Sequence, residues 1–182
     1  MAISCNNQIF SLHTKHSTYQ MKVDRDFLIH TYYGPYVGDS DMSYLARCID
    51  RGFSGNPDGI TDKGYSLDTQ LLEYPSYGTG DFRNDCLRVA YADGSQVTDL
   101  KYVSHEIKEG KYGLEGLPAM YQGEENVQTL EVVLQDVYKK LEVILYYGVF
   151  ENLDVITRAC KIVNKGEDKV NLFESLLYVP GF

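Results

Sequence analysis

Tryptophan is absent from this 182-residue sequence, basic residues are few, and long apolar runs are missing. The chain has 17 Lys and Arg residues against 26 Asp and Glu residues, which gives a net charge of −9 without any basic cluster. Nucleic-acid binding usually requires a basic surface, so we expect no nucleic-acid partner. No stretch approaches the roughly 18 apolar residues of a membrane-spanning helix, so we also expect no membrane partner.

Closely spaced cysteines are missing as well. The four cysteines form no Cys-x-x-Cys pair and lie far apart, at Cys5, Cys48, Cys86 and Cys160. This spacing argues against a zinc or redox site. Residues 1–10 lack the basic start and the apolar core of a signal peptide. Because disulfides persist mainly in oxidising compartments, we expect a cytoplasmic protein with free thiols.

Tyrosine is abundant instead, with 16 residues, and it suits half-buried strand surfaces. Short segments that alternate apolar and polar residues between turn residues predict β-strands. They cover 8–12, 18–23, 27–33, 87–91, 97–103, 126–134, 137–150, 155–163 and 170–179. No clear helical stretch separates them, so we predict an all-β domain, a sandwich of mainly antiparallel strands.

Three segments carry a more specific prediction. Asp24-Arg25-Asp26 predicts a polar hairpin turn between the strands on either side. Asp93-Gly94 predicts a second tight hairpin, joining strands 87–91 and 97–103, because such turns need positive φ. Residues 133–147 also fit a helical spacing, but their β-branched and aromatic content favours a strand.

The longest segment without a regular pattern is the loop 50–83. Gly and Pro interrupt it throughout, while charged and aromatic residues stand between them. Loops longer than about 12–15 residues are usually functional or disordered, and disordered segments are poor in aromatics. We therefore predict an ordered surface loop that presents polar groups to a ligand or partner.

Six carboxylates in this loop are the candidates for chemistry: Asp50, Asp58, Asp62, Asp68, Glu73 and Asp81. A pair about 5–5.5 Å apart is the signature of a retaining glycosidase, whereas isolated loop carboxylates usually bond to nearby backbone. The four histidines have no metal-ligand spacing, and no Gly-x-Ser-x-Gly elbow accompanies them. We expect structural roles for His13, His16, His30 and His105.

Several motifs in the loop and beyond it resemble a known family. They are Asp50-Arg51-Gly52-Phe53-Ser54, Tyr65-Ser66-Leu67-Asp68-Thr69, Glu73-Tyr74-Pro75-Ser76-Tyr77-Gly78-Thr79-Gly80-Asp81-Phe82-Arg83, Tyr102-Val103-Ser104-His105, Gly116-Leu117-Pro118-Ala119 and Val155-Ile156-Thr157-Arg158. Together they resemble the N-terminal domain of bacterial α-galactosidases of glycoside hydrolase family 36, nearly end to end and in order.

The resemblance implies a β-supersandwich that precedes a (β/α)₈ barrel. In the family that barrel carries both catalytic aspartates and needs no metal or other cofactor. Such a barrel takes about 250 residues, so residues 1–182 would be only part of the N-terminal domain, with no catalytic residue in this chain. The implied substrates are galactose-containing oligosaccharides of the raffinose type. The family also forms homotetramers, and residues 74–83 would suit an interface.

The resemblance also assigns two substrate-binding residues, Asp50 and Lys63. A carboxylate at Asp50 would accept hydrogen bonds from adjacent galactose hydroxyls. Lys63 would line the pocket, although a lysine lacks the planar fork of the arginine often found there. Alternatively, Asp50 only caps its turn or pairs with Arg47 or Arg51.

Two other functions stay open. One is an autonomous carbohydrate-binding or assembly module without a catalytic partner, against which the absence of tryptophan platforms counts. The other is a mutarotase-like sandwich enzyme, which would need a catalytic histidine and glutamate, such as His30 or His105 with Glu106.

Overall fold

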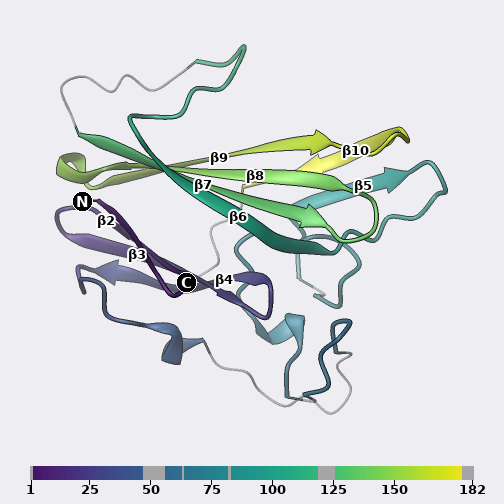
Figure 1. Cartoon of the computed structure of the whole chain (residues 1–182), viewed down its shortest axis with the longest axis horizontal. Helices are drawn as coiled ribbons and strands as arrows, with labels where there is room; N and C mark the ends of the chain where they lie inside the picture. Colours follow the sequence, from purple (N-terminus) through teal and green to yellow (C-terminus); the bar gives the residue numbers. More distant parts are fainter. Residues whose placement is uncertain (1, 47–55, 63, 82, 119–125, 178–182) are drawn as a thin grey trace.

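The protein is a ten-stranded β-sandwich in the computed structural model, which describes residues 2–46, 56–62, 64–81, 83–118 and 126–177 (Figure 1). The strands are β1 (Ile3–Asn6), β2 (Ile9–His13), β3 (Ser17–Asp24), β4 (Phe27–Pro35), β5 (Leu87–Tyr91), β6 (Leu100–Glu109), β7 (Val127–Asp136), β8 (Leu141–Phe150), β9 (Val155–Asn164) and β10 (Val170–Ser175). Three single-turn 3₁₀ helices complete the described part: η1 (Ser43–Leu45), η2 (Leu67–Thr69) and η3 (Glu151–Leu153). The all-β prediction is confirmed.

The strands form two four-stranded sheets and one pair, and every strand ladder is antiparallel. The sheet β1-β2-β3-β4 faces the sheet β6-β7-β8-β9, and the pair β10-β5 lies at one end of the second sheet (Figure 1). Alternate residues of β8, from Leu141 to Tyr147, are buried in the core between the layers, as their period of two predicts. The strand interpretation of residues 133–147 is therefore correct except at residues 137–140, which form the turn between β7 and β8, so the strand predicted over 137–150 begins only at Leu141.

One predicted hairpin is confirmed and the other is wrong. The turn at Arg25 joins β3 and β4, which pair along their length. The Asp93-Gly94 turn also forms, with Gly94 at φ +82°, but the strand before it pairs with β10 rather than β6. After the turn, Thr98 N–H donates to Tyr77 O at 3.1 Å, and β6 begins only at Leu100. Long-range pairing therefore decided the strand's partner, whereas the local residues specified only the turn.

The last third of the loop joins the sheets along one flank. The Leu71 carbonyl accepts a hydrogen bond from His30 N–H at 2.7 Å, and Glu73 N–H donates to Leu28 O at 2.9 Å. This part therefore extends the sheet beyond β4. A few residues later, Tyr77 N–H donates to Leu87 O at 3.0 Å, so the chain runs beside β5.

Glu73 lies between these two attachments, with no exposed surface. Its Oε1 accepts hydrogen bonds from the hydroxyls of Tyr19 in β3 at 2.6 Å and Tyr147 in β8 at 2.8 Å. The Arg158 guanidinium of β9 lies 2.6 Å from the same oxygen. On the other side, Oε2 lies 3.6 Å from His30 Nδ1, too far for a hydrogen bond. One carboxylate thus connects the loop to strands of both large sheets.

The charge of Glu73 persists despite its burial. Burial alone raises the pKa of a carboxyl group, but the nearby Arg158 guanidinium holds the pKa of Glu73 below its ordinary value. Burial and the Glu73 charge together raise the pKa values of Tyr19 and Tyr147. Both hydroxyls therefore stay protonated and able to donate to the carboxylate.

We expect Glu73→Gln to lower the free energy of unfolding of the chain by about 3–5 kcal/mol, because it removes the negative charge that lies 2.6 Å from the buried Arg158 guanidinium. Urea unfolding followed by circular dichroism measures this change. Glu167→Gln, at an exposed glutamate, is the control and should stay within about 0.5 kcal/mol of the unmodified chain. Equal stability of the two variants would contradict the assignment.

Acid should weaken this link. Because the pKa of Glu73 is lower in the folded state than in the unfolded state, its contribution is complete above about pH 4.3 and is lost as pH falls through the folded-state pKa. The difference in free energy of unfolding between the unmodified chain and Glu73→Gln should therefore shrink as the pH is lowered from about 6 to about 3. A difference that stays constant over that range would show that Glu73 is not ionised.

Candidate functional site

The candidate site is the loop that begins after η1 and ends before β5. Both residues assigned to substrate binding, Asp50 and Lys63, lie outside the described residues. Their roles stay predictions. In the sequence, the described residues next to these two positions are Ala46, before residues 47–55, and Asp62 and Gly64, on either side of position 63.

A small apolar cluster fixes the loop to the outer side of β4. It consists of Phe27 and Ile29 from β4 and Tyr65, Leu67 and Leu72 from the loop. Leu72 also forms an isolated antiparallel bridge with Ile29. Burying these side chains on each other stabilises the loop conformation, since each buried side chain of this size contributes about 1.5–3 kcal/mol. The prediction of an ordered loop holds for its described part.

A cavity of about 250 Å³ opens beside this cluster. Its walls come from the β3–β4 hairpin, the end of η1 and the loop: Lys22, Asp24, Arg25, Ile29, Ser43, Ala46, Asp62, Tyr65 and Gln70. Two of these lining residues, Ala46 and Asp62, are each the last described residue before a masked stretch of the sequence, 47–55 and 63 respectively.

Arg25 organises the polar side of this cavity. Its Nη2 lies 2.8 Å from Asp62 Oδ2, and its guanidinium lies 4.4 Å from the centre of the Tyr65 ring. Hydrogen bonds from Arg25 and from Gly64 N–H hold the pKa of Asp62 below its ordinary value. Carboxylate, guanidinium and amide groups beside an aromatic side chain offer the acceptors and donors that bind sugar hydroxyls.

Sequence reasoning missed Arg25 as part of the site and assigned it only to a turn. The sequence signal that could have found it was an arginine at a turn position where Asn, Asp or Gly is usual. Arg25 and Asp26 have φ values of +48° and +67°, and such turn positions normally hold Asn, Asp or Gly. An arginine in this conformation projects its long side chain from the hairpin onto Tyr65 and Asp62.

The other described loop carboxylates do not form a catalytic pair. Asp58 accepts a hydrogen bond from the Tyr138 hydroxyl at 2.8 Å, and Asp68 accepts one from Ser66 at 2.5 Å. Asp81 pairs with Arg83 at 2.7 Å. Together with the burial of Glu73, these contacts assign structural roles to Asp58, Asp68, Glu73 and Asp81, and leave Asp62 as the described loop carboxylate that lines the cavity beside Arg25.

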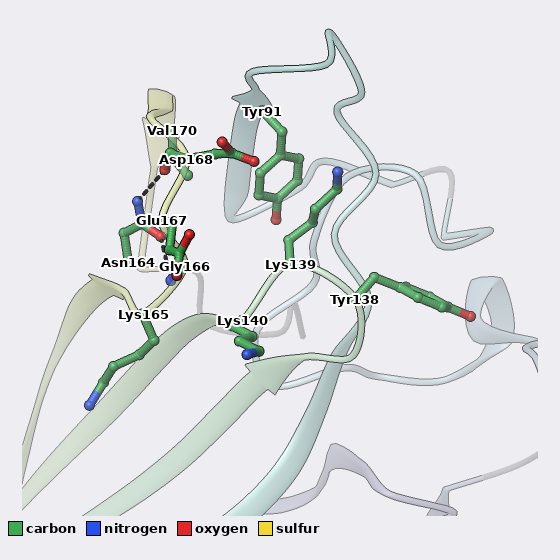
Figure 2. A pocket seen from close by; sticks show the side chains of 10 residues that line it. All are labelled: Tyr91, Tyr138, Lys139, Lys140, Asn164, Lys165, Gly166, Glu167, Asp168 and Val170. Atoms are coloured by element: carbon green, nitrogen blue, oxygen red, sulfur yellow. Dashed lines mark hydrogen bonds between the residues drawn. The ribbon is translucent and has the colours of Figure 1, made fainter.

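A second cavity, of about 370 Å³, lies between the β7–β8 and β9–β10 turns (Figure 2). Its lysines are largely neutralised by neighbouring carboxylates. Lys139 pairs with Asp93, and Lys165 lies 3.4 Å from Glu142. Tyr138 points away from the cavity, and the Tyr91 ring is almost fully buried. Two of its three lysines therefore already have carboxylate partners, and neither of its tyrosines turns an exposed ring face into the cavity.

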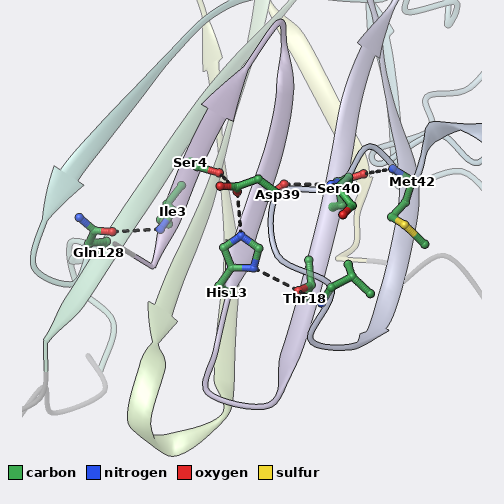
Figure 3. Close-up of polar contacts among 11 residues, drawn as sticks. Ile3, Ser4, His13, Thr18, Asp39, Ser40, Met42 and Gln128 are labelled. Atoms are coloured by element: carbon green, nitrogen blue, oxygen red, sulfur yellow. Dashed lines mark hydrogen bonds and ion pairs between the residues drawn. The ribbon is translucent and has the colours of Figure 1, made fainter.

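His13 belongs to a Thr–His–Asp arrangement that has a structural role (Figure 3). Its Nδ1 lies 3.1 Å from Thr18 Oγ1 and its Nε2 lies 3.0 Å from Asp39 Oδ1. Thr18 is completely buried and also accepts a hydrogen bond from Val37 N–H. A nucleophile without access to substrate cannot react, so the arrangement instead fastens residues 37–39 to the sheet.

The mutarotase-like arrangement is not formed. His105 Nδ1 lies 2.7 Å from the Tyr102 hydroxyl, and the ring packs on Phe10. The side chain of Glu106 points to the opposite face of β6, because neighbouring strand residues alternate. His30 is buried beside Glu73. Neither histidine therefore shares an accessible site with Glu106.

Two residues of the predicted interface segment are used within the chain. Tyr74 is buried, with its hydroxyl 3.3 Å from Ser175 Oγ. Arg83 bonds to Asp81 and to the backbone carbonyl of Leu67 at 3.2 Å.

Within the described ranges, no three metal-ligating side chains gather, and no helix is long and apolar enough to cross a membrane. Cys5 and Cys160 are free thiols.

Comparison with known proteins agrees with the resemblance. Residues 26–180 match the model of the glycosyl hydrolase family 36 N-terminal domain. The chain is 48% identical over 169 residues to the bifunctional alpha-galactosidase/sucrose kinase AgaSK of Mediterraneibacter gnavus, covering 92% of this chain and 18% of AgaSK. It is 42% identical over 180 residues to the alpha-galactosidase AgaA of Geobacillus stearothermophilus, covering 97% of this chain and 25% of AgaA.

Solved structures agree as well. The galactosidase domain of AgaSK superposes with a TM-score of 0.91 at 47% identity, covering 96% of this chain and 25% of that one. An AgaA variant in complex with raffinose and another in complex with stachyose each superpose with a TM-score of 0.86 at 42% identity, covering 93% of this chain and 24% of theirs. The chain thus spans about a quarter or less of these relatives. It belongs to glycoside hydrolase family 36, and the part of the family that it matches is the N-terminal domain.

Proposed function

We propose that this chain is one part of a longer retaining α-galactosidase that hydrolyses terminal α-galactosides of raffinose-type oligosaccharides. The observation that carries the proposal is the match of residues 26–180 to the N-terminal domain of the family. AgaA, a relative 42% identical, has been crystallised with raffinose and with stachyose. In this proposal a barrel elsewhere in the polypeptide supplies the nucleophile and the acid/base.

Within that enzyme, the loop contributes contacts to galactose. Asp50 would accept hydrogen bonds from adjacent sugar hydroxyls, and Lys63 would donate to the substrate as a point charge. The cavity beside Arg25 and Asp62 supports this role, because its walls adjoin both segments in the sequence. The link through Glu73 would hold the loop at a constant position against the sheets.

The proposal includes a homo-oligomeric enzyme in the cytoplasm. The free thiols of Cys5 and Cys160 support a reducing compartment, where thiols stay unpaired. The homotetramer follows from the family resemblance. Sedimentation of the longer enzyme would test it.

The first test is hydrolysis of p-nitrophenyl α-galactoside. The isolated 182-residue chain should release no p-nitrophenol above background, because it carries no catalytic pair. A chimaera in which this chain replaces the matched 169 residues of AgaSK should hydrolyse the substrate. Turnover by the isolated chain, or an inactive but folded chimaera, would refute the proposal. Millimolar or tighter sugar binding by a chain that supports no hydrolysis would instead favour an autonomous binding module.

The second test is Asp50→Ala in the active chimaera. We expect kcat/KM to fall about 10- to 1000-fold, or about 1.4–4 kcal/mol, because a charge-assisted contact to galactose is lost. Asp58→Ala is the matched control in the same loop, since Asp58 bonds to Tyr138 and does not line the cavity beside Arg25. Unchanged kinetics for Asp50→Ala would remove its assignment to substrate binding.

A further inference from the structure

The turn between β3 and β4 carries a side chain that its backbone does not favour. Arg25 has φ +48°, and Asp26 after it has φ +67°. This left-handed region suits Gly, Asn or Asp, because a longer side chain crowds its own backbone there. Such residues persist where the surrounding structure holds them, and they concentrate at functional sites. The contacts of Arg25 therefore indicate what an arginine does at this position.

The Arg25 guanidinium contacts two residues of the loop at once. Its Nη2 lies 2.8 Å from Asp62 Oδ2, and the group lies 4.4 Å from the centre of the Tyr65 ring. The same ring stacks on Phe27, and its hydroxyl donates to Asp24 O at 3.3 Å. These contacts hold the loop against the hairpin that carries Arg25.

Asp62 extends this attachment along the loop. Its Oδ1 accepts a hydrogen bond from Gly64 N–H at 2.9 Å, and its backbone carbonyl accepts one from Tyr65 N–H at 3.0 Å. In the sequence, Asp62 and Gly64 are the two neighbours of Lys63. The residues on both sides of Lys63 are therefore bonded to one carboxylate, which Arg25 holds.

This ion pair lies at the surface, so its effect is local. The Arg25 and Asp62 side chains are 39% and 55% exposed. Ion pairs as exposed as this one add little to global stability, and salt screens them. Removing Arg25 should therefore release this part of the loop while the fold stays intact.

We propose that Arg25 is a positioning residue of the α-galactosidase proposed above. Through Asp62 and Tyr65 it places the segment that contains Lys63, and it thereby supports the contact of that lysine with galactose. A segment that is already held loses less entropy when the substrate binds. The inference rests on the proposed substrate contact of Lys63, and Arg25 itself acts through the loop rather than on the sugar.

The first test is Arg25→Ala in the active AgaSK chimaera. We expect KM for p-nitrophenyl α-galactoside to rise about 10- to 100-fold while kcat changes less than about twofold, because a binding contact is misplaced and the reacting groups are not. Partial unfolding would instead lower kcat and leave KM unchanged, since it only reduces the amount of active enzyme.

Arg88→Ala is the matched control for this test. Arg88 is 38% exposed, lies 2.9 Å from Asp85 and lies 4.7 Å from the centre of the Tyr77 ring. It therefore loses the same kinds of contact at a place away from the cavity beside Arg25. Both kinetic constants should stay within about twofold of those of the unmodified chimaera.

The second test asks whether Arg25 acts through Lys63. In a chimaera that already carries Lys63→Ala, Arg25→Ala should change kcat/KM by less than about twofold, because residues that act as one unit are not additive. Losses that multiply would overturn the positioning role. Unchanged kinetics for Lys63→Ala alone would refute its proposed substrate contact and this inference with it. Unchanged kinetics for Arg25→Ala alone would refute only this inference.

Hydrogen exchange in the 182-residue chain tests the attachment without catalysis. Arg25→Ala should speed exchange of the Tyr65 amide, which donates to Asp62 O, at least about tenfold and leave Tm within about 2 °C. Arg88→Ala should leave this amide unchanged. Unaltered exchange of Tyr65 in Arg25→Ala would overturn the inference whatever the chimaera does. A Tm lower by more than about 5 °C would assign Arg25 to the stability of the fold instead.

Discussion

A buried carboxylate constrains the whole arrangement. An ionised group cannot leave water unless hydrogen bonds and an opposite charge replace its hydration, and Glu73 obtains these partners from strands of two different sheets. The loop that carries Glu73 must therefore pass between β4 and β5, where Tyr19, Tyr147 and Arg158 converge. A shift of either sheet would separate the charge from part of its compensation.

This constraint gives the loop a defined position. Its earlier part packs Tyr65, Leu67 and Leu72 on the outer side of β4, and its later part follows β5. A Gly-rich segment attached at both places loses much of its freedom before any ligand binds, which lowers the entropy cost of binding. The cavity beside Arg25 is thus built on fixed walls, as a site for a polar ligand requires.

The first sheet and β10 differ in how well their side chains are enclosed. The first sheet is fastened by buried polar contacts, including those of His13 with Thr18 and Asp39. β10, in contrast, leaves several large apolar side chains in water. Because apolar burial is the main driving force for folding, the described part of the chain encloses the apolar side chains of the first sheet more completely than those of β10.

The sequence by itself predicted nine of the ten described strands, missing β1, together with the two turns and the family, because these depend on residue period, turn chemistry and motifs that are local in the chain. β8 follows its alternating pattern, and the turns at Arg25 and Gly94 form where their residues predict. The tertiary structure alone decided that β5 pairs with β10, that Arg25 faces Tyr65 and Asp62, and that Glu73 is buried rather than displayed. Each of these depends on contacts between residues far apart in the chain, whose energies no local pattern contains.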